Sequence, residues 1–194
     1  LFNLYTNDLP ATASRKFIYA DDICLTIQAH TFVELECTLT ADMARMAQYC
    51  HRWRLKPSVT KTVSSIFHLH NANAAMELTV VMDEQRLRHD PKPVYLGVTL
   101  DRTLSYKDHL QKTAGKLKTR NNLLSKLVGT TWGANANTMR SSALALCYSV
   151  GEYCAPVWAR SAHTNLVDVQ LNTTMRLITG TVQPTPLAWL PVLS

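Results

Sequence analysis

Two adjacent aspartates, Asp21 and Asp22, are the residues of this 194-residue chain whose type and spacing most clearly indicate chemistry. Their flanks, residues 17–20 and 23–27, are apolar and rich in β-branched or aromatic side chains, which predicts two short buried strands joined by a tight turn. Adjacent carboxylates repel one another, and Asp-Asp is a poor two-residue turn. A divalent cation removes the repulsion, because Mg²⁺ is commonly held by one or two carboxylates together with substrate phosphates. The alternative is a solvated Asp-Asp turn.

A second chemical pattern is basic. Lys112, Lys116 and Arg120 recur every four residues, so they share one face of a predicted helix. The chain carries a net charge of +6 and a pI near 9.2, which favours a polyanionic partner. The alternative is a solvated basic face on a packed helix.

The elements that position the aspartates begin with the hairpin itself. Thr31 and Glu34 have capping-box spacing, so a helix should start there and end before Pro57. Its apolar positions form one stripe at helical period, which predicts packing on a sheet. The stripe consists of Leu35, Leu39, Met43, Met46, Cys50 and Trp53.

Strands are expected over residues 63–69, 78–82 and 94–100, with a polar turn at residues 83–86. The last strand should begin near a sheet edge because Pro91 and Pro93 precede it.

After Asp101 the pattern is helical. Ser105 and Asp108 form a second capping-box candidate, and the helix that follows carries Leu110, Leu117 and Leu124 on one face and should stop near Gly129. Two more helices are predicted over residues 138–154 and 164–179, the latter with Gly180 as a C-terminal stop, before a Pro-rich irregular tail. The fold class is therefore α+β, an antiparallel sheet with a packed helix followed by an all-helical part.

Composition excludes several classes. The hydrophobic fraction of 46% is ordinary for a globular protein, and five cysteines without framework spacing argue against a disulfide scaffold. No signal peptide or membrane-spanning run is recognisable, so an intracellular protein without a membrane partner is expected. The chain begins at Leu1 rather than Met, which indicates a fragment.

The tetrapeptide Tyr19-Ala20-Asp21-Asp22 at a strand–turn–strand resembles the catalytic hairpin of reverse transcriptases. Other segments agree in order, and over essentially the whole chain the sequence resembles the reverse transcriptases of non-LTR, jockey-like retrotransposons (LINE elements). These segments are residues 1–10, Trp53 with Leu55 and Lys61-Thr62, residues 95–101, 153–158, 170–172 and 176–180, and Pro184 to Leu187.

The resemblance implies RNA-templated DNA synthesis by two Mg²⁺ or Mn²⁺ ions, about 4 Å apart, in the complete enzyme. It makes Asp21 a direct metal ligand and Asp22 a supporting ligand, and it places Tyr19 near the primer end or the incoming nucleotide. Lys61 would protonate the leaving pyrophosphate as a general acid, the alternative being a solvated surface lysine.

The resemblance also divides the chain into the C-terminal part of a palm (1–103), a helical thumb or connection (104–182) and an irregular tail (183–194). Tyr95 and Gly97 fall in the primer-grip-like strand, and Lys112, Lys116 and Arg120 would contact duplex phosphates without reading sequence. The implied partners are an RNA template, a DNA primer or target duplex, dNTP and the rest of a polyprotein with fingers, upstream palm and a possible endonuclease. The implied locations are cytoplasm and nucleus.

The chain departs from the family pattern in lacking the first metal-binding aspartate, the fingers with their basic residues, and the glutamine-containing motif expected just upstream of Leu1. The family's first metal-binding aspartate lies in an earlier palm motif, and this chain begins after it, so the fragment alone should be inactive. Two alternatives remain: a non-catalytic nucleic-acid-binding remnant of a decayed element, and a structural or assembly subunit that keeps a palm-like fold without binding metal at Asp21.

Overall fold

The computed structural model describes residues 6–129 and 133–194, which form two compact units, Leu1–Pro93 and Val94–Ser194. Both units contain helices and small sheets, which agrees with the predicted α+β class. The predicted helix end at residues 1–5 lies outside the described residues. None of the described helices is both long enough and apolar enough to cross a bilayer.

The first unit opens with the predicted hairpin. Strands β1 (Arg15–Tyr19) and β2 (Asp22–Thr26) are antiparallel, with Tyr19 directly opposite Asp22. The turn is therefore Ala20-Asp21 rather than Asp21-Asp22, and Ala20 adopts the left-handed conformation with φ 51°. The prediction that both strands are buried is wrong. Among the described residues no third strand pairs with them, and most of their side chains are exposed.

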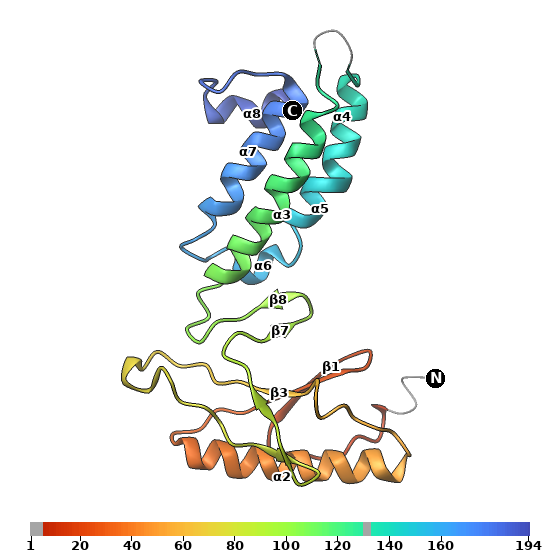
Figure 1. Ribbon diagram of the computed structural model, residues 1–194, viewed down its shortest axis with the longest axis vertical. Helices are drawn as coiled ribbons and strands as arrows, with labels where there is room; N and C mark the ends of the chain where they lie inside the picture. Colours follow the sequence, from red (N-terminus) through yellow and green to blue (C-terminus); the bar gives the residue numbers. More distant parts are fainter. Residues whose placement is uncertain (1–5, 130–132) are drawn as a thin grey trace. The chain divides into compact units, whose positions relative to one another are not determined.

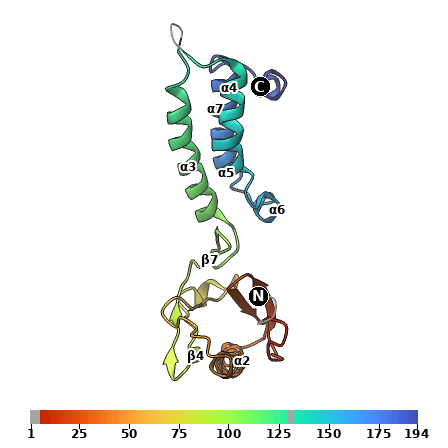
Figure 2. The same cartoon turned by 90° about the vertical axis from the view of Figure 1, so that its right-hand side faces the viewer.

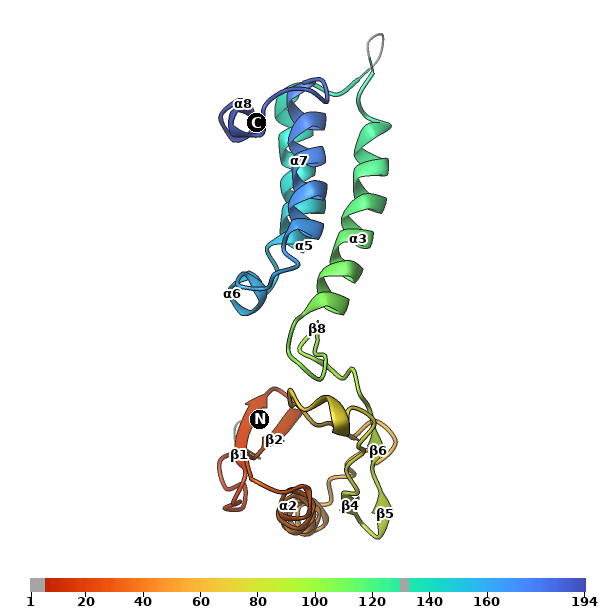
Figure 3. The same ribbon diagram turned by 90° about the vertical axis from the view of Figure 1, so that its left-hand side faces the viewer.

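Helix α2 (Phe32–Arg52) confirms the predicted capping signal, because the Thr31 side chain accepts a hydrogen bond from the Glu34 backbone N–H. Leu35, Leu39 and Met43 of the stripe, together with Phe32, pack against a small core. That core consists of Ala47, Leu78, Val80, Met82 and Leu87. Figure 3 looks nearly along α2 and shows the β1–β2 hairpin on one side of it and strands β4 to β6 on the other.

The remaining sheets of this unit are shorter than predicted. Strand β3 (Val63–Ser64) pairs in parallel with β6 (Arg88–His89), and β4 (Val81–Met82) pairs antiparallel with β5 (Gln85–Arg86). The polar turn is confirmed, with positive φ at Asp83 and Glu84, and a 3-10 turn, η1, spans Asn71–Asn73. The predicted antiparallel sheet is thus replaced by separate two-stranded pairs.

The second unit begins with a hairpin where one strand was predicted. Strands β7 (Val94–Tyr95) and β8 (Val98–Thr99) are antiparallel around Leu96 and Gly97, whose φ values are 45° and 78°. Positive φ at both central residues is the geometry of a tight hairpin turn. Gly97 was the sequence signal for it, hidden by the apolar residues on both sides. The predicted 1–103 part included this hairpin, which here belongs to the second compact unit.

Three long helical segments run side by side in this unit (Figure 1). The first is α3 (Lys107–Ser125), the second comprises α4 (Ala136–Ala143), the π-helix η2 (Leu144–Tyr148) and α5 (Ser149–Gly151), and the third is α7 (Asn165–Thr179). Figure 2 shows the second segment as a single helical rod. Short helices complete the unit: α6 (Ala155–Trp158), η3 (Leu187–Trp189) and α8 (Leu190–Leu193). The tail is therefore partly helical rather than wholly irregular.

The predicted leucine stripe is confirmed, since Leu110, Leu117 and Leu124 are fully buried in the bundle core. The predicted Ser105–Asp108 capping box is wrong. Tyr106 is the N-cap residue of α3, with φ 60° and no capping bond from its side chain. The Asp101 carboxylate accepts the backbone N–H groups of Ser105 and Tyr106 instead. The predicted Gly180 stop is confirmed by its left-handed φ of 67°.

Candidate functional site

The Tyr19–Asp22 turn presents its polar groups to solvent. Because Tyr19 and Asp22 are directly opposite, their side chains lie on the same face of the hairpin. Both aspartates are exposed, and Tyr19 is 65% exposed. In the described part of the chain, no hydrogen bond or ion pair joins either carboxylate to another group. The hairpin therefore offers two unneutralised carboxylates and a phenol at one tip.

Two carboxylates suit a hard cation such as Mg²⁺ but do not complete its coordination shell. Within residues 6–129 and 133–194, no three His, Cys, Asp or Glu side chains are arranged to hold a metal ion. A cation bound at this tip would therefore need further ligands from phosphates, water or other protein segments.

Behind the hairpin lies a buried carboxylate that sequence reasoning missed. Asp42 of α2 is completely buried and accepts backbone N–H bonds from Ser14 (2.7 Å) and Ala13 (3.1 Å), the residues just before β1. Burial raises the pKa of Asp42, but hydrogen bonds from Ser14 and Ala13 and the charge of Arg45 outweigh burial and lower it below 3.8. The signal was available, because Asp42 interrupts the apolar stripe of the helix.

Two turns further along α2, Tyr49 makes a second polar link to the same segment. Its hydroxyl donates a 2.7 Å hydrogen bond to the Asp8 carboxylate. Burial, followed by the bond to Asp8, raises the pKa of Tyr49 to about 12. The hydroxyl therefore stays protonated and remains a donor at any ordinary pH.

Lys61, the predicted general acid, lies in an exposed turn before β3. Its backbone N–H donates to the Ser58 carbonyl in this turn. No hydrogen bond or ion pair connects it to Asp21 or Asp22 among the described residues. Its role as a general acid stays a prediction.

The β7–β8 hairpin is held at its tip by an aromatic ring. Tyr153 donates a 2.8 Å hydrogen bond to the Leu96 carbonyl. A Cβ atom at Gly97 would lie 3.2 Å from the same ring, so glycine suits this position both by conformation and by space. Tyr95, at the end of β7, and Gly97, in the turn, thus belong to a hairpin whose tip is hydrogen-bonded to Tyr153.

The end of this hairpin is bonded to α3. The Thr99 N–H donates to Nδ1 of His109 (3.4 Å), and Lys112 Nζ donates to the Thr99 hydroxyl (3.2 Å). Burial lowers the pKa of His109, and the charges of Lys116 and Lys112 lower it further. The acceptor role of Nδ1 requires a neutral ring, so the lowered pKa and the bond agree.

The three residues of α3 that were predicted to contact phosphates therefore differ in availability. Lys112 is bonded to Thr99, and the Arg120 guanidinium donates to the Leu146 carbonyl of the π-helix. Lys116 is exposed, with no hydrogen bond or ion pair among the described residues.

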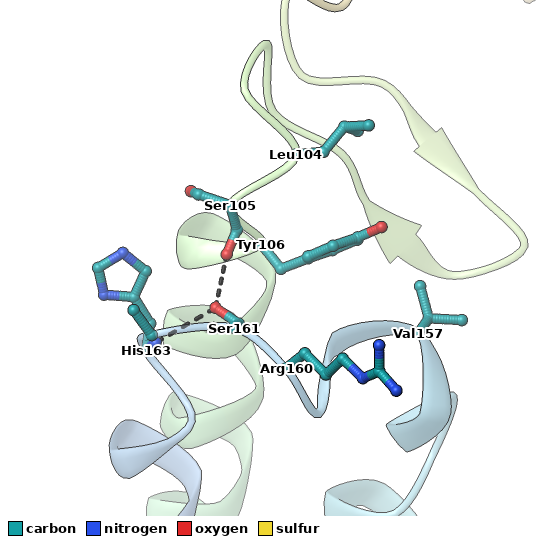
Figure 4. Close-up of a pocket in the computed structure, with 8 residues that line it drawn as sticks. Leu104, Ser105, Tyr106, Val157, Arg160, Ser161 and His163 are labelled. Carbon is teal, nitrogen blue, oxygen red and sulfur yellow. Dashed lines mark hydrogen bonds between the residues drawn. The ribbon is translucent and has the colours of Figure 1, made fainter. Parts of the chain in front are cut away.

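A pocket of about 370 Å³ lies beside the start of α3 (Figure 4). The Ser161 hydroxyl donates to the Ser105 carbonyl at 2.6 Å, and the ring of His163 points away from the Tyr106 phenol. The lining residues are Leu104, Ser105, Tyr106, Val157, Arg160, Ser161, Ala162 and His163. The pocket contains one guanidinium and no carboxylate, but none of the proposed site residues lines it.

Comparison with known proteins gives two curated relatives from Drosophila melanogaster. The probable RNA-directed DNA polymerase from transposon BS is 28% identical over 193 residues, which cover 92% of this chain. The RNA-directed DNA polymerase from mobile element jockey is 22% identical over 193 residues, which cover 93%. The chain is a homologue of these transposon polymerases.

The homology extends along nearly the whole chain but only along a fifth of each polymerase, 21% of the BS protein and 20% of the jockey protein. No family model matches the chain, and no solved structure matches it significantly. The relationship to non-LTR transposon polymerases therefore rests on sequence similarity to these proteins.

Proposed function

We propose that this chain is the C-terminal palm and thumb portion of an RNA-directed DNA polymerase of a non-LTR retrotransposon. One observation carries the proposal: Tyr19-Ala20-Asp21-Asp22 forms an exposed hairpin tip in a chain homologous to two such polymerases. The parent enzyme would copy element RNA into DNA from a target primer, with dNTP as substrate, in cytoplasm and nucleus. The palm would extend over residues 1–103 and the thumb over residues 104–182.

In this proposal Asp21 and Asp22 hold Mg²⁺ or Mn²⁺ through their exposed oxygens. The bound ions would stabilise the charge on the attacking and leaving oxygens of nucleotidyl transfer. Ala20 has the small side chain that lets a primer end approach the turn, and Tyr19 lies on the same hairpin face as Asp22. The exposed carboxylates support this role in that no protein donor among the described residues occupies the oxygens a cation would use.

The helical unit supports the proposal through Lys116, which is free to meet a duplex phosphate. Lys116→Ala in the parent polymerase should reduce the slope of log affinity for duplex against log salt by about one. Arg120→Ala should act differently, through loss of its bond to the Leu146 carbonyl. An unchanged salt slope for Lys116→Ala would count against a thumb role for this face.

The direct test is primer extension by a longer polypeptide that contains these residues together with fingers and upstream palm. Asp21→Asn and Asp22→Asn should each lower nucleotide incorporation more than about a hundredfold, because metal sites lose affinity or activity by tenfold to a hundredfold even when a supporting residue is removed. Glu84→Gln is the matched control, since it alters another acidic hairpin turn. Retained incorporation by Asp21→Asn would overturn the proposal.

The 194-residue chain alone is expected to incorporate no nucleotide, because Asp21 and Asp22 form only part of a metal site. The same incomplete ligand set favours a second candidate, a nucleic-acid-binding remnant without catalysis. A parent reading frame that lacks an upstream metal-binding aspartate, combined with salt-dependent duplex binding by the chain, would select the remnant.

A further inference from the structure

We propose that Asp42 is a positioning residue for the β1–β2 hairpin, and that it sets the orientation of the Asp21–Asp22 tip from the buried side of α2. The inference rests on the proposed function for its catalytic consequence. Its structural part, a carboxylate that fixes the start of β1, stands on the contacts of Asp42 itself.

The contacts are specific for a carboxylate. Its two oxygens receive two consecutive backbone N–H groups, Oδ1 from Ala13 and Oδ2 from Ser14, and Arg45 lies 3.2 Å from Oδ1. Hydrogen bonds to an ionised acceptor are about twice as strong as neutral ones. Residue 15, which follows at once, is the first residue of β1. The bond pair therefore fixes both the position and the direction with which the chain enters the hairpin.

Within residues 6–129 and 133–194, no other strand pairs with the hairpin. A two-stranded hairpin is marginally stable in water by itself. Its apolar side chains Phe17, Ile18 and Ile23 remain 40–42% exposed, so their burial is incomplete. We therefore expect the hydrogen bonds of the buried Asp42 carboxylate, made just before β1, to determine much of where the hairpin tip lies.

A hydrogen bond of Tyr49 adds to the attachment of the segment before β1 to α2. Tyr49 lies seven residues after Asp42, about two helical turns, so both side chains leave α2 on one face. Its bond to Asp8 fixes the segment that leads to Ala13. Helix α2 is thus hydrogen-bonded to residues 8–14 at two places, through Asp42 and through Tyr49.

The first test measures hydrogen exchange of backbone amides in the 194-residue chain. Asp42→Asn replaces one acceptor with an NH₂ group that faces a backbone N–H. We expect amides of β1 and β2 to exchange at least about tenfold faster while those of α3 and α7 are unchanged. The matched control is Glu36→Gln on the same helix, whose carboxylate accepts the Thr79 N–H at 2.5 Å on a different segment. Equal hairpin exchange in Asp42→Asn and wild type would overturn the proposal.

A second variant covers the case in which Asp42→Asn unfolds the whole chain. Tyr49→Phe keeps the ring and removes only the donor to Asp8. Faster exchange confined to β1 and β2 supports the proposal that bonds from α2 to residues 8–14 position the hairpin, and unchanged hairpin exchange contradicts it.

The catalytic test uses the parent polymerase at a temperature where each variant is folded. Asp42→Asn should lower kcat for single-nucleotide addition by about tenfold to a hundredfold, the effect of misplacing a reacting group by about 1 Å. Affinity for primer–template should not change, which separates positioning from general damage. Asp21→Asn is measured in parallel. Activity retained by Asp21→Asn defeats the proposed function, whereas loss in Asp21→Asn with normal kcat in Asp42→Asn defeats only the positioning role.

Discussion

The two hairpins with candidate nucleic-acid residues are held in different ways. The β1–β2 hairpin has exposed apolar side chains and is tied to α2 through backbone N–H groups before its first strand. The β7–β8 hairpin is bonded at its turn by Tyr153 and at its end by His109 and Lys112, next to a bundle with a leucine core. The first hairpin is therefore held through the chain that leads into its first strand, while the second is held by side chains at its turn and at its end.

The largest expected effect is in the bundle core. Leu117→Ala should lower the free energy of unfolding of the second unit by about 2–5 kcal/mol, because Leu117 is fully buried. Urea denaturation followed by far-UV circular dichroism measures it. Leu123→Ala on the same helix, at a side chain 50% exposed, and Ile23→Ala in the β1–β2 hairpin should each cost less than about 1 kcal/mol. Equal losses of unfolding free energy at all three positions would contradict the difference between the buried bundle core and the exposed positions.

A smaller effect concerns the buried polar contact between α3 and α7. The Thr174 hydroxyl donates to Asn121 Oδ1 at 2.7 Å, and Asn121 Nδ2 donates to the Gln170 carbonyl. Thr174→Val removes the donor and should destabilise the unit by about 1–3 kcal/mol. The neighbouring Thr173→Val, whose hydroxyl is exposed, is the control. If both variants melt at the wild-type temperature, the polar contact contributes nothing to bundle stability.

Two glycines predict changes of opposite sign. Gly97→Ala should destabilise by about 1–2 kcal/mol, since its φ is 78° and a methyl group would press on Tyr153. Gly115→Ala in the interior of α3 meets no atom within 4 Å and should stabilise by about 0.5–1 kcal/mol. Thermal melting of both variants measures the pair, and a shift in the same direction for both would contradict the turn assignment.

The smallest effect is a pH dependence at His109. Its pKa is lowered from 6.5 by burial and then by Lys116 and Lys112, so the folded chain binds fewer protons than the unfolded chain in weak acid. The stability contributed by the neutral ring is fully present above pH 6.5 and is lost as pH falls through the lowered pKa. His109→Gln should flatten this part of the profile, measured as unfolding free energy from pH 7.5 downward. A wild-type slope in the variant would assign the dependence to other groups.

Local signals predicted much of the fold. The Thr31 cap, the leucine stripe of α3 and the Gly180 stop depend on neighbours three or four residues away, so the sequence contains them directly. The two strands around Asp21 were predicted for the same reason. Their exposure was not predicted, because a continuous apolar run indicates which side chains favour burial and not whether a partner is present.

What the sequence left out depends on partners distant along the chain. Asp42 is bonded to residues 28 and 29 positions away, and Tyr49 to one 41 positions away. An acidic residue at helical spacing from Leu39 and Met46 was nevertheless a usable warning. The residues predicted to bind metal and nucleic acid remain predictions, although the exposed carboxylates and the free Lys116 are compatible with them.

The π-helix η2 changes which side chains of its helical segment face the core. Met139, Ala143, Cys147 and Gly151 are spaced by four residues, and all are buried. In a regular α-helix of 3.6 residues per turn, each such step would rotate the side chain by about 40°, so the last would leave the core. The wider turn at Leu144–Tyr148 cancels the drift, and Gly151 meets Leu171 as a result. Deleting a single residue from this turn would restore ideal winding and leave Gly151 on the core face, because the wider turn accommodates one extra residue without rotating the helix that follows.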